Sequence, residues 1–254
     1  MSLRARVWMT SDSPAVAEAV GRLPFDYINI DMQHGFADYS AVVEMLRAFD
    51  GVAGGGTSSP AITCRVPWNE PGIIGRVLDA GAIGVIIPMV NTVEQAERAV
   101  AACRYAPLGS RSYGPIRALR ARGADYFESA NDRVACIPMI EKSEAVRNLD
   151  GILDVTGIDA VYVGPADLSL TMGLAPRGDH DDAVFEEALR AIVAACERRG
   201  IVAGIHANPA VAMKRREQGF RMVTVTSDLQ ALEAGAVAAL DAGGGDGDGA
   251  GALY

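Results

Sequence analysis

The sequence is nearly devoid of lysine. Only two of its 23 basic residues are lysines, Lys142 and Lys214. An enzyme that forms a Schiff base needs a lysine that faces its site. Lys214 lies in Ala210–Gln218, which is predicted to be a helix, and Lys142 directly follows Glu141, so strand alternation turns it outward wherever Glu141 points inward. Both positions argue against covalent amine catalysis.

Positive charge, long apolar runs and paired cysteines are also scarce. The net charge of −9 argues against nucleic acid or an anionic membrane as a partner, because phosphate binding needs clustered Lys and Arg. No apolar run approaches the roughly 20 residues of a membrane span, and no secretory leader is recognisable. The four cysteines lie far apart without a C-x-x-C pair. We therefore expect a cytoplasmic protein that binds small molecules.

What the chain does contain is a regular alternation of strand and helix patterns. Short runs rich in β-branched residues recur about every 30 residues, as buried strands do. Helical patterns lie between most of them, for example the apolar face of Ile73, Ile74, Val77 and Leu78. The eight predicted strands are Arg6–Met9, Tyr27–Asp31, Ala61–Arg65, Gly84–Pro88, Val134–Ile140, Ala160–Gly164, Ile201–Ile205 and Met222–Thr226.

Eight alternating units predict an α/β protein with a (β/α)₈ TIM barrel in a single domain. Barrels of this kind run to about 250 residues, which suits a chain of 254. A doubly wound sheet is the alternative, but its first turn is usually rich in glycine, and Met9–Ser13 is not. Asn91 with Glu94, and Ser227 with Gln230, resemble capping boxes at helix starts.

Three segments interrupt this rhythm. Gly51–Pro60 is rich in Gly and Ser and is predicted to be a flexible loop on the helix-to-strand side. Tyr105–Asp132 is a long connection after the fourth strand, and long loops in barrels often cover the active site. Ala242–Ala252 is rich in Gly, Asp and Ala, which predicts a barrel domain over residues 1–241 and a disordered tail over 242–254.

Polar side chains stand at the ends of several predicted strands. Active sites of barrels are built at the carboxyl ends of the strands, so these side chains should converge at one rim. Two carboxylates among them, Glu141 and Asp167, supply the hard oxygen ligands that suit Mg²⁺ or Mn²⁺ carrying waters and a chelating substrate. A lone acid at a strand end is more simply a helix cap, and the size of the set favours the functional interpretation: Asp31, His34, Arg65, Glu141 and Asp167.

The three histidines differ in their surroundings. His34 follows Asp31 closely, so the Asp31 carboxylate is positioned to hold the imidazole in one tautomer as a general base. His206 ends the seventh strand, where a structural role and a place in the pocket remain equally open. His180 lies among Asp179, Asp181 and Asp182 and is most simply a solvated loop residue.

Two further features point to an anionic substrate. Arg65 ends a buried strand, where its charge requires a partner that an anionic substrate or an enolate oxygen would supply. If a helix starts after Pro165, its first backbone N–H groups face the pocket and can bind a carboxylate. Pro at the first position of an ordinary helix explains that sequence equally well.

Seven segments together resemble one family. They are Ile28–His34, Arg65–Asn69, Leu78–Gly81, Pro88–Thr92, Arg104–Gly109, Ile140–Glu141 and Val163–Ser169. In this order, from about residue 5 to residue 240, the chain resembles the class II, metal-dependent pyruvate aldolases. That family includes 4-hydroxy-2-oxoheptanedioate aldolase and 2-dehydro-3-deoxyglucarate aldolase.

The resemblance implies an activity, a cofactor and roles for residues. A 4-hydroxy-2-oxo acid is cleaved to pyruvate and an aldehyde through a metal-stabilised enolate, with Mg²⁺, Mn²⁺ or Co²⁺ at Glu141 and Asp167. Backbone groups of Gly164, Pro165, Ala166 and Asp167 would hold the carboxylate, and Arg65 would bind the enolate oxygen. His34, oriented by Asp31, would move the proton of the 4-hydroxyl. A homo-oligomer, a hexamer of dimers that exchange helices, is also implied.

The chain departs from the family pattern at three places. Met139 replaces Gln two residues before the metal Glu, and Gln33 replaces Glu before the His. Both changes remove polar groups or charge near the metal, which bears on metal preference. Arg111–Pro115 replaces the frequent Arg-Gly-x-Gly, in a loop that is expected to approach the aldehyde half.

Three alternatives stay open at this stage. A CoA-thioester lyase of the malyl-CoA or citramalyl-CoA type would want a basic surface for the CoA phosphates. A phosphosugar barrel would carry glycine-rich phosphate turns after strands seven and eight, where the chain has Ala207–Pro209 and Ser227–Leu229. A non-catalytic barrel that only binds a 2-oxo acid is the third.

Overall fold

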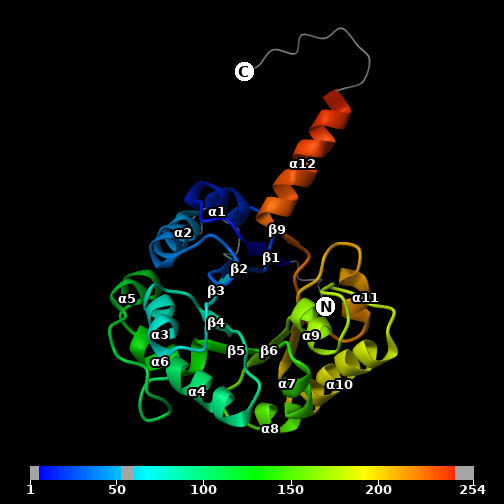
Figure 1. The fold of residues 1–254 in the computed structure, drawn as a ribbon. Helices are drawn as coiled ribbons and strands as arrows, with labels where there is room; N and C mark the ends of the chain where they lie inside the picture. Colours follow the sequence, from blue (N-terminus) through cyan, green and yellow to red (C-terminus); the bar gives the residue numbers. More distant parts are fainter. Residues whose placement is uncertain (1–5, 53–59, 244–254) are drawn as a thin grey trace.

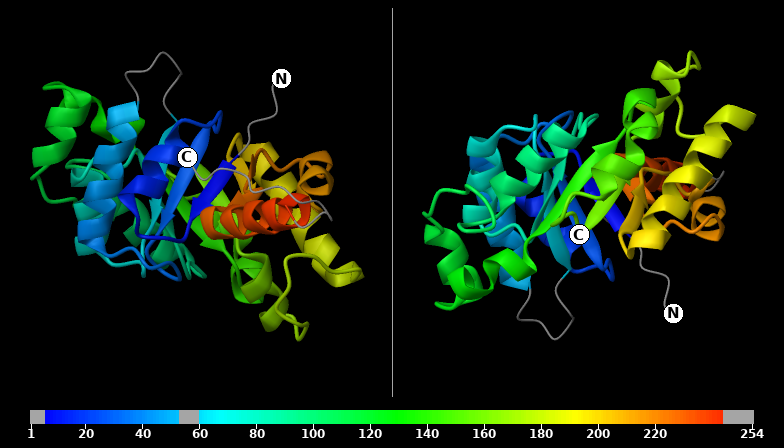
Figure 2. Two further views of the ribbon diagram at one scale, coloured as in Figure 1. Left: turned by 90° about the horizontal axis from the view of Figure 1, so that it is seen from above. Right: turned by 90° about the horizontal axis from the view of Figure 1, so that it is seen from below.

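The strands form one curled parallel sheet, and the helices lie on its outside (Figure 1). The computed structural model describes residues 6–52 and 60–243. Two further views show the same arrangement, with the strands in the middle of the molecule (Figure 2). The strands are β1 Arg6–Met9, β2 Tyr27–Asp31, β3 Ala61–Arg65, β4 Gly84–Ile87, β5 Ala135–Ile140, β6 Ala160–Val163, β7 Val202–Ile205, β8 Met222–Val223 and β9 Thr226–Ser227.

Twelve helices are found in the described part of the chain. They are α1 Pro14–Gly21, α2 Tyr39–Val52, α3 Pro71–Asp79, α4 Val93–Cys103, α5 Ile116–Arg122, α6 Tyr126–Arg133, α7 Ser143–Arg147, α8 Leu149–Leu153, α9 Pro165–Thr171, α10 Ala183–Arg199, α11 Ala212–Glu217 and α12 Asp228–Gly243. They follow the strands in alternation, which is why every strand pair in the sheet is parallel.

The sheet runs in the order β8-β7-β6-β5-β4-β3-β2-β1-β9, with neighbouring strands hydrogen-bonded. Its two ends belong to one short segment, residues 222–227. There the N–H of Thr224 donates to the carbonyl of Ile205 in β7 at 3.1 Å, and the N–H of the next residue, Val225, donates to Arg6 in β1 at 3.1 Å. The segment therefore passes from pairing with the seventh strand to pairing with the first.

The strands match the prediction closely. Three of them, β1, β2 and β3, have the predicted bounds, and four others differ by one residue at one end. The eighth predicted strand, Met222–Thr226, is instead divided into β8 and β9. The physical reason is the transfer of hydrogen bonds at Thr224 and Val225, which bond to different neighbouring strands.

Strand alternation divides the buried residues between the two faces of the sheet. Val7, Met9, Ile28 and Ile30 belong to the large cluster that packs against the helices. The residues of opposite parity form a second cluster on the inner face: Trp8, Tyr27, Ile86, Ile137, Met139, Ala160, Tyr162 and Met222. Continuing this alternation to the carboxyl ends of β2, β3, β5 and β7 puts Asp31, Arg65, Glu141 and His206 on the inner face too.

Helix starts follow ordinary capping chemistry, with one correction. The predicted box of Ser227 and Gln230 is confirmed, since each backbone N–H donates to the other's side chain, at 3.3 and 3.2 Å. The predicted box of Asn91 and Glu94 is wrong by one residue. Thr92 and Gln95 form it, because Thr92 has the extended backbone that a cap requires.

The long connection Tyr105–Asp132 does not cover the pocket, contrary to our expectation. It follows α4 rather than β4, and it contains α5 and α6 before leading into β5. Two of its arginines bind at the carboxyl end of α3: Arg111 pairs with Asp79 at 2.6 Å, and Arg122 donates to the carbonyl of Gly81, just beyond the helix, at 2.9 Å. The connection therefore belongs to the end of the sheet where strands begin, and Arg111–Pro115 with it.

The carboxyl-terminal helix stands apart from the body. In Figure 1, α12 projects away from the other helices, beyond β1 and β9. Its start is held by Asp228, which accepts hydrogen bonds from the backbone and hydroxyl groups of Thr10 and Ser11. Its other side chains from Gln230 to Gly243 are exposed. The helix ends at Gly243, two residues beyond the predicted end of the barrel domain at residue 241.

Some predictions fall on residues outside the described ranges. Of the predicted loop Gly51–Pro60, the first two residues complete α2, and 53–59 are not described. Residues 244–254, most of the predicted tail, are not described either. Within the described ranges, no helix combines the length and the apolar character needed to cross a membrane.

Candidate active site

A pocket of about 220 Å³ lies at the carboxyl ends of the strands. It brings together seven of the eight residues proposed from the sequence; the eighth, Asp31, lies behind Arg65 and is hydrogen-bonded to it. The pocket is lined by His34, Arg65, Met139, Glu141, Tyr162, Gly164, Pro165, Ala166, Asp167, Gly178 and His206. Residues at the carboxyl ends of β2, β3, β5, β6 and β7 therefore face one small volume.

Arg65 and Asp31 form a two-point ion pair. Nε of Arg65 lies 2.8 Å from Oδ1 of Asp31, and Nη2 lies 2.5 Å from Oδ2. The two residues are register partners on β2 and β3, so their side chains leave the sheet side by side. None of the hydrogen bonds formed among the described residues uses Nη1 of Arg65. That N–H group is the one available to a substrate.

The environment of Asp31 favours its ionised form. Burial would raise the pKa of this carboxyl, but the hydrogen bonds and charge of Arg65, with further bonds from Trp8 and the Gln33 N–H, hold it below its usual value. Trp8 donates its indole N–H to Oδ2 at 3.1 Å. Asp31 is thus an anion that neutralises and orients Arg65. The sequence interpretation had not assigned Asp31 to Arg65 as a partner.

The contact between Asp31 and His34 differs from the expected one. We expected the carboxylate to hold the imidazole, but Oδ1 accepts the backbone N–H groups of Gln33 and His34, at 3.0 and 3.3 Å. The carboxylate oxygens are engaged by these groups, by Arg65 and by Trp8. Asp31 therefore shapes the turn that carries His34, whose exposed side chain lines the pocket.

Glu141 is a buried carboxylate that lacks a positively charged partner in direct contact. It follows β5, is 2% exposed, and accepts one hydrogen bond at 2.5 Å from the backbone N–H of Met89. Met89 has a left-handed backbone with φ 61°, unusual for a residue with a side chain, and this conformation belongs to the turn that presents its N–H. Burial raises the pKa of Glu141, and the Asp167 charge adds to the rise.

These carboxylates fit a divalent cation. Two acids that face one pocket, one of them buried with a raised pKa, lack the counter-charge that a cation supplies. Gly164 leaves room for the Glu141 carboxylate, since a Cβ there would lie 2.8 Å from Oε2. Among the residues that the structure describes, no cluster of three or more His, Cys, Asp or Glu could hold a metal. Magnesium commonly binds through one or two carboxylates and waters.

The start of α9 offers backbone donors to the same pocket. Gly164 precedes the helix, Pro165 takes its first position, and Leu168 is the first residue whose N–H bonds back to Gly164. The N–H groups of Ala166 and Asp167 have no hydrogen-bond acceptor among the described residues. Both residues line the pocket. The arrangement suits an anionic oxygen beside the two carboxylates.

Sequence reasoning left out two aromatic residues: Tyr162, which lines the pocket, and Trp8, which packs against Tyr162. Trp8 is 2% exposed, and its ring centre lies 5.1 Å from that of Tyr162. The guanidinium carbon of Arg65 lies 5.0 Å from the centre of the Trp8 ring. The Tyr162 hydroxyl bonds to Thr224 at 2.5 Å. The signal was present in the sequence, because Trp8 and Tyr162 have the parity of the inner face.

The three histidines are now distinguished. His206 follows β7, lines the pocket, and meets the Trp8 ring edge-on at 5.2 Å. Burial and the neighbouring Arg65 charge lower the pKa of His206 to about 4, so the imidazole is neutral near pH 7. His180 packs against Phe185 and is not part of the pocket lining.

Both departures near the carboxylates have structural consequences. Met139 is 2% exposed and belongs to the inner apolar cluster, so it brings an apolar side chain beside Glu141. The side-chain oxygen of Gln33 is buried and has no hydrogen-bond partner within the described residues. The surroundings of the acids are therefore less polar than a Gln at 139 would make them.

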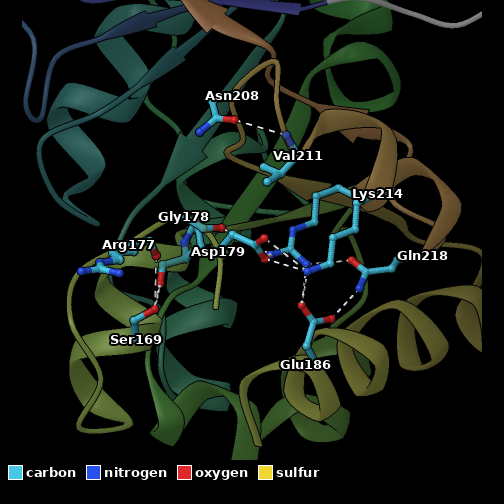
Figure 3. A network of polar contacts seen from close by, with 11 residues as sticks. Ser169, Arg177, Gly178, Asp179, Glu186, Asn208, Val211, Lys214 and Gln218 are labelled. Carbon is cyan, nitrogen blue, oxygen red and sulfur yellow. Dashed lines mark hydrogen bonds and ion pairs between the residues drawn. The ribbon is translucent and has the colours of Figure 1, made fainter. Parts of the chain in front are cut away.

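One wall of the pocket is held by a second charged network (Figure 3). Arg215 in α11 is fully buried. Its Nη2 pairs with Oδ1 of Asp179 at 2.5 Å and also donates to the carbonyl of Gly178 at 3.4 Å. Nη1 reaches Glu186 in α10 at 3.2 Å. Gly178 lines the pocket. The network therefore fixes the segment that closes the pocket between α9 and α10.

The two lysines are excluded from the pocket. Lys214 pairs with Asp179 and Glu186, both at 2.9 Å, in the same network. Lys142 precedes α7 and is not part of the lining. This placement agrees with the expectation from the sequence that neither lysine faces the site.

Comparisons with known proteins agree over nearly the whole chain. The sequence model of the family described as "HpcH/HpaI aldolase/citrate lyase" matches residues 4–234. A hydroxypyruvate/pyruvate aldolase of Rhizorhabdus wittichii is 39% identical over 233 residues, covering 90% of this chain and 89% of that protein. A 4-hydroxy-2-oxo-heptane-1,7-dioate aldolase of Salmonella dublin is 38% identical over 237 residues, covering 91% and 87%.

The fold is shared with solved structures as well. The crystal structure of an HpcH/HpaI aldolase/citrate lyase family protein from Burkholderia cenocepacia superposes with a TM-score of 0.85 at 31% identity, covering 95% of this chain and 94% of that one. An HpcH/HpaI aldolase from Desulfitobacterium hafniense gives 0.83 at 25% identity, covering 99% and 95%.

Proposed function

Because the chain belongs to the HpcH/HpaI aldolase/citrate lyase family, we propose that it is an aldolase that cleaves a 4-hydroxy-2-oxo acid into pyruvate and an aldehyde. The resemblance read from the sequence is thereby confirmed at the level of the family. The observation that carries the activity is the meeting of Glu141, Asp167, Arg65 and His34 in one pocket. A retro-aldol cleavage needs a bound 2-oxo acid, a stabiliser for the enolate and a base for the 4-hydroxyl.

The sheet fits a closed (β/α)₈ barrel. Support comes from the segment 222–227, which bonds to β7 through Thr224 and to β1 through Val225. Counted as one strand in two parts, β8 and β9 complete eight strands in sequence order. The site then lies at the rim where barrel enzymes carry their chemistry.

A divalent cation, Mg²⁺, Mn²⁺ or Co²⁺, is proposed to bind through Glu141 and Asp167. When bound, it would polarise the 2-oxo group and offset the negative charge that develops there. Glu141 is held for this role by Met89, whose N–H fixes Oε1. Gly164 keeps the space around Oε2 open.

Substrate binding is assigned to the opposite sides of the same pocket. The carboxylate of the 2-oxo acid would accept the N–H groups of Ala166 and Asp167, with Gly164 and Pro165 setting the start of the helix. Nη1 of Arg65 would donate to the 2-oxo oxygen as it becomes an enolate oxygen. Asp31 holds Arg65 in place and keeps the net charge of the pair near zero.

His34 is proposed as the base. Cleavage of the C3–C4 bond requires removal of the proton from the 4-hydroxyl, and the bonding electrons then pass to the enolate. His34 lines the pocket from the turn that Asp31 shapes. Its exposure lets the proton leave to solvent, directly or through a water.

The proposed assembly is a homo-oligomer that uses α12. Leu232, Val237 and Leu240 are 66%, 56% and 73% exposed on this helix, an apolar surface that a second copy of the chain would cover. The resemblance implies helix exchange within a hexamer. Leu240→Glu should lower the mass measured by light scattering on a sizing column, and an unchanged mass would contradict this role of α12.

We propose a cytoplasmic location. All four cysteines are buried and unpaired, as thiols in a reducing compartment are. Fractionation of cells that produce the full chain would test the assignment.

A CoA-thioester lyase is the alternative within the family's description. Arg65 and Glu141 would serve it as well, and the net charge of −9 disfavours binding of the CoA phosphates. The two activities are separated by substrate. Malyl-CoA or citramalyl-CoA cleavage without any release of pyruvate from 4-hydroxy-2-oxo acids would favour the alternative.

The test measures pyruvate release from a 4-hydroxy-2-oxo acid in an assay coupled to lactate dehydrogenase. Release that requires Mg²⁺, Mn²⁺ or Co²⁺ and stops with EDTA is the expected result. The proposal would be contradicted if no metal supports pyruvate release, either from a substrate with one carboxylate or from a substrate with two.

A further inference from the structure

His206 is a polar group in the pocket that the proposed reaction does not use. It lies one residue beyond β7, and its neighbours Gly204 and Ile205 show by alternation that its side chain belongs to the inner face. Among the other polar side chains of the lining, Glu141 and Asp167 have a role in cation binding, Arg65 in enolate stabilisation and His34 in proton removal. The Tyr162 hydroxyl is bonded to Thr224. His206 has no role in that scheme.

The imidazole packs against an aromatic ring and forms no hydrogen bond within the described residues. Its ring meets the edge of Trp8 at 5.2 Å and an interplanar angle of 89°, and Trp8 is itself held by Asp31 and packed on Tyr162. No hydrogen bond formed among the described residues involves either imidazole nitrogen. The ring is therefore packed against Trp8 in a residue that lines the pocket, and its donor and its acceptor are unpaired among the described residues.

The electrostatics select a neutral ligand group for this imidazole. The ring is uncharged near pH 7, so it offers one N–H donor and one acceptor rather than a positive charge. The carboxylate of a substrate already has the α9 start and the proposed cation as partners, and its 2-oxo oxygen has Arg65. A hydroxyl group, which both donates and accepts, is the chemical complement of a neutral imidazole.

We propose that His206 is a specificity-determining residue that hydrogen-bonds a substrate hydroxyl other than the 4-hydroxyl at which the chain is cleaved. The inference rests on the proposed aldolase function and deepens it by naming the substrate class, hydroxylated 2-oxo acids or hydroxylated aldehydes. Such a hydroxyl has two possible sources. It lies at C3 when hydroxypyruvate replaces pyruvate, and beside the carbonyl when the aldehyde is a hydroxyaldehyde.

A substrate without this hydroxyl would cover the imidazole and leave it unpaired. A site built to hydrogen-bond a hydroxyl discriminates strongly against the analogue that lacks it, because buried polar groups are then left without partners. The imidazole is only partly buried, so water reaches it in part. We expect a preference of about ten-fold in kcat/KM for the hydroxylated member of a matched pair.

The experiment measures aldol addition by the full-length protein with a divalent metal, for His206→Leu and His206→Gln beside the unaltered chain. Two matched pairs are used: hydroxypyruvate against pyruvate with one aldehyde, and glycolaldehyde against acetaldehyde with pyruvate. His206→Leu should lower kcat/KM about ten-fold for the hydroxylated member of one pair and less than about three-fold for its partner. His206→Gln, which keeps a donor and an acceptor, should restore most of the preference.

The pair that responds identifies the source of the hydroxyl. His180→Leu is the matched control, since it makes the same change at a histidine outside the pocket, and it should alter both members of each pair equally. Equal losses for both members in His206→Leu, or no losses, would overturn the inference and leave the aldolase function standing. An unaltered chain that forms no product from any pair would instead overturn the proposed function, and the inference with it.

A binding measurement checks the donor pair without turnover. Titration calorimetry of hydroxypyruvate and pyruvate, each without aldehyde, should show a loss of affinity for hydroxypyruvate alone in His206→Leu if the donor supplies the hydroxyl. If the aldehyde supplies it, both affinities stay unchanged while the glycolaldehyde preference is lost. Unchanged affinities together with an unchanged glycolaldehyde preference would overturn the inference.

Discussion

Arg65, which is partly buried, and Arg215, which is fully buried, are both paired with carboxylates, but they serve different purposes. Arg215 is bonded on both terminal nitrogens, to Asp179 and Glu186, and these contacts join α11 to α10 and the preceding segment. Arg65 lines the pocket, has one protein carboxylate, Asp31, and has no hydrogen bond at Nη1 within the described residues. A buried ion pair with its partners complete holds structure together. One that leaves a donor facing a cavity is prepared for a ligand.

The same contrast holds for the carboxylates of the two regions. Asp179 and Glu186 lie beside Arg215 and Lys214. Burial would raise the pKa of each carboxyl, but the bonds and charges of these two basic residues lower it below its ordinary value. Glu141 is more deeply buried, is bonded only to a backbone N–H, and has a raised pKa. The network around Arg215 is electrostatically complete. The pocket is not, and a cation or a substrate would complete it.

The largest effect is expected from removing the incomplete charge. Glu141→Gln should lower kcat/KM by roughly 10³-fold, as loss of a key transition-state stabiliser does, and should weaken metal affinity with it. The measurement is pyruvate release over a metal titration. Glu144→Gln, an exposed change in α7, is the control and should leave both quantities intact. Full turnover in Glu141→Gln would remove Glu141 from the metal site.

Arg65→Lys tests the arginine that faces the pocket. A lysine keeps the charge but loses the two-point pairing with Asp31 and the geometry of Nη1, so kcat should fall by roughly 100-fold. Metal affinity should change little, because the arginine's proposed partner is the enolate oxygen. An equal loss of metal affinity would make Arg65 a structural residue like Arg215.

Arg215→Met tests the arginine whose two terminal nitrogens are both paired with carboxylates. Removing one member of a buried ion pair leaves carboxylates uncompensated, and we expect a loss of about 3 kcal/mol in the free energy of unfolding. Measured in urea at neutral pH, this loss should exceed that of Arg65→Lys. At a temperature where the variant is folded, kcat should stay within about three-fold of the original. A loss of activity without a loss of stability would reverse the comparison.

The last effect concerns pH, and it is absent near neutrality. The pKa of His206 is lowered to about 4 in the folded protein, below the ordinary value of about 6.5. Between these values the unfolded chain takes up a proton that the folded one does not, so stability falls as the pH drops from about 6.5 to 4. His206→Leu should reduce this fall. An identical dependence in both proteins, measured by urea unfolding at several pH values, would contradict the assignment.

Much of the fold was readable from the sequence because its strands are short, apolar and regularly spaced. Alternation also placed Asp31, Arg65 and Glu141 on one face, and the same count from β7 includes His206. Failures arose where long-range contacts decide the outcome. The division of β8 from β9 depends on two neighbouring strands, and Tyr105–Asp132 was misplaced because α4 separates it from β4.

The site was predictable in its membership and less so in its contacts. Seven of the eight proposed residues line one pocket, a result of strand-end chemistry. The pairing of Asp31 with Arg65 rather than with the His34 imidazole could not be read from spacing, because β2 and β3 register decides it. The left-handed backbone of Met89 leaves no mark in a sequence that has no glycine there.

The central claim is that the incomplete charge at Glu141 and Asp167 serves to make an enolate. It is tested most directly by proton NMR of pyruvate in D₂O with the protein and Mg²⁺, Mn²⁺ or Co²⁺, with EDTA as the control. The account predicts that the methyl protons exchange for deuterium only with metal, and far more slowly in Glu141→Gln. Exchange that persists with EDTA, or none with any metal, would contradict it.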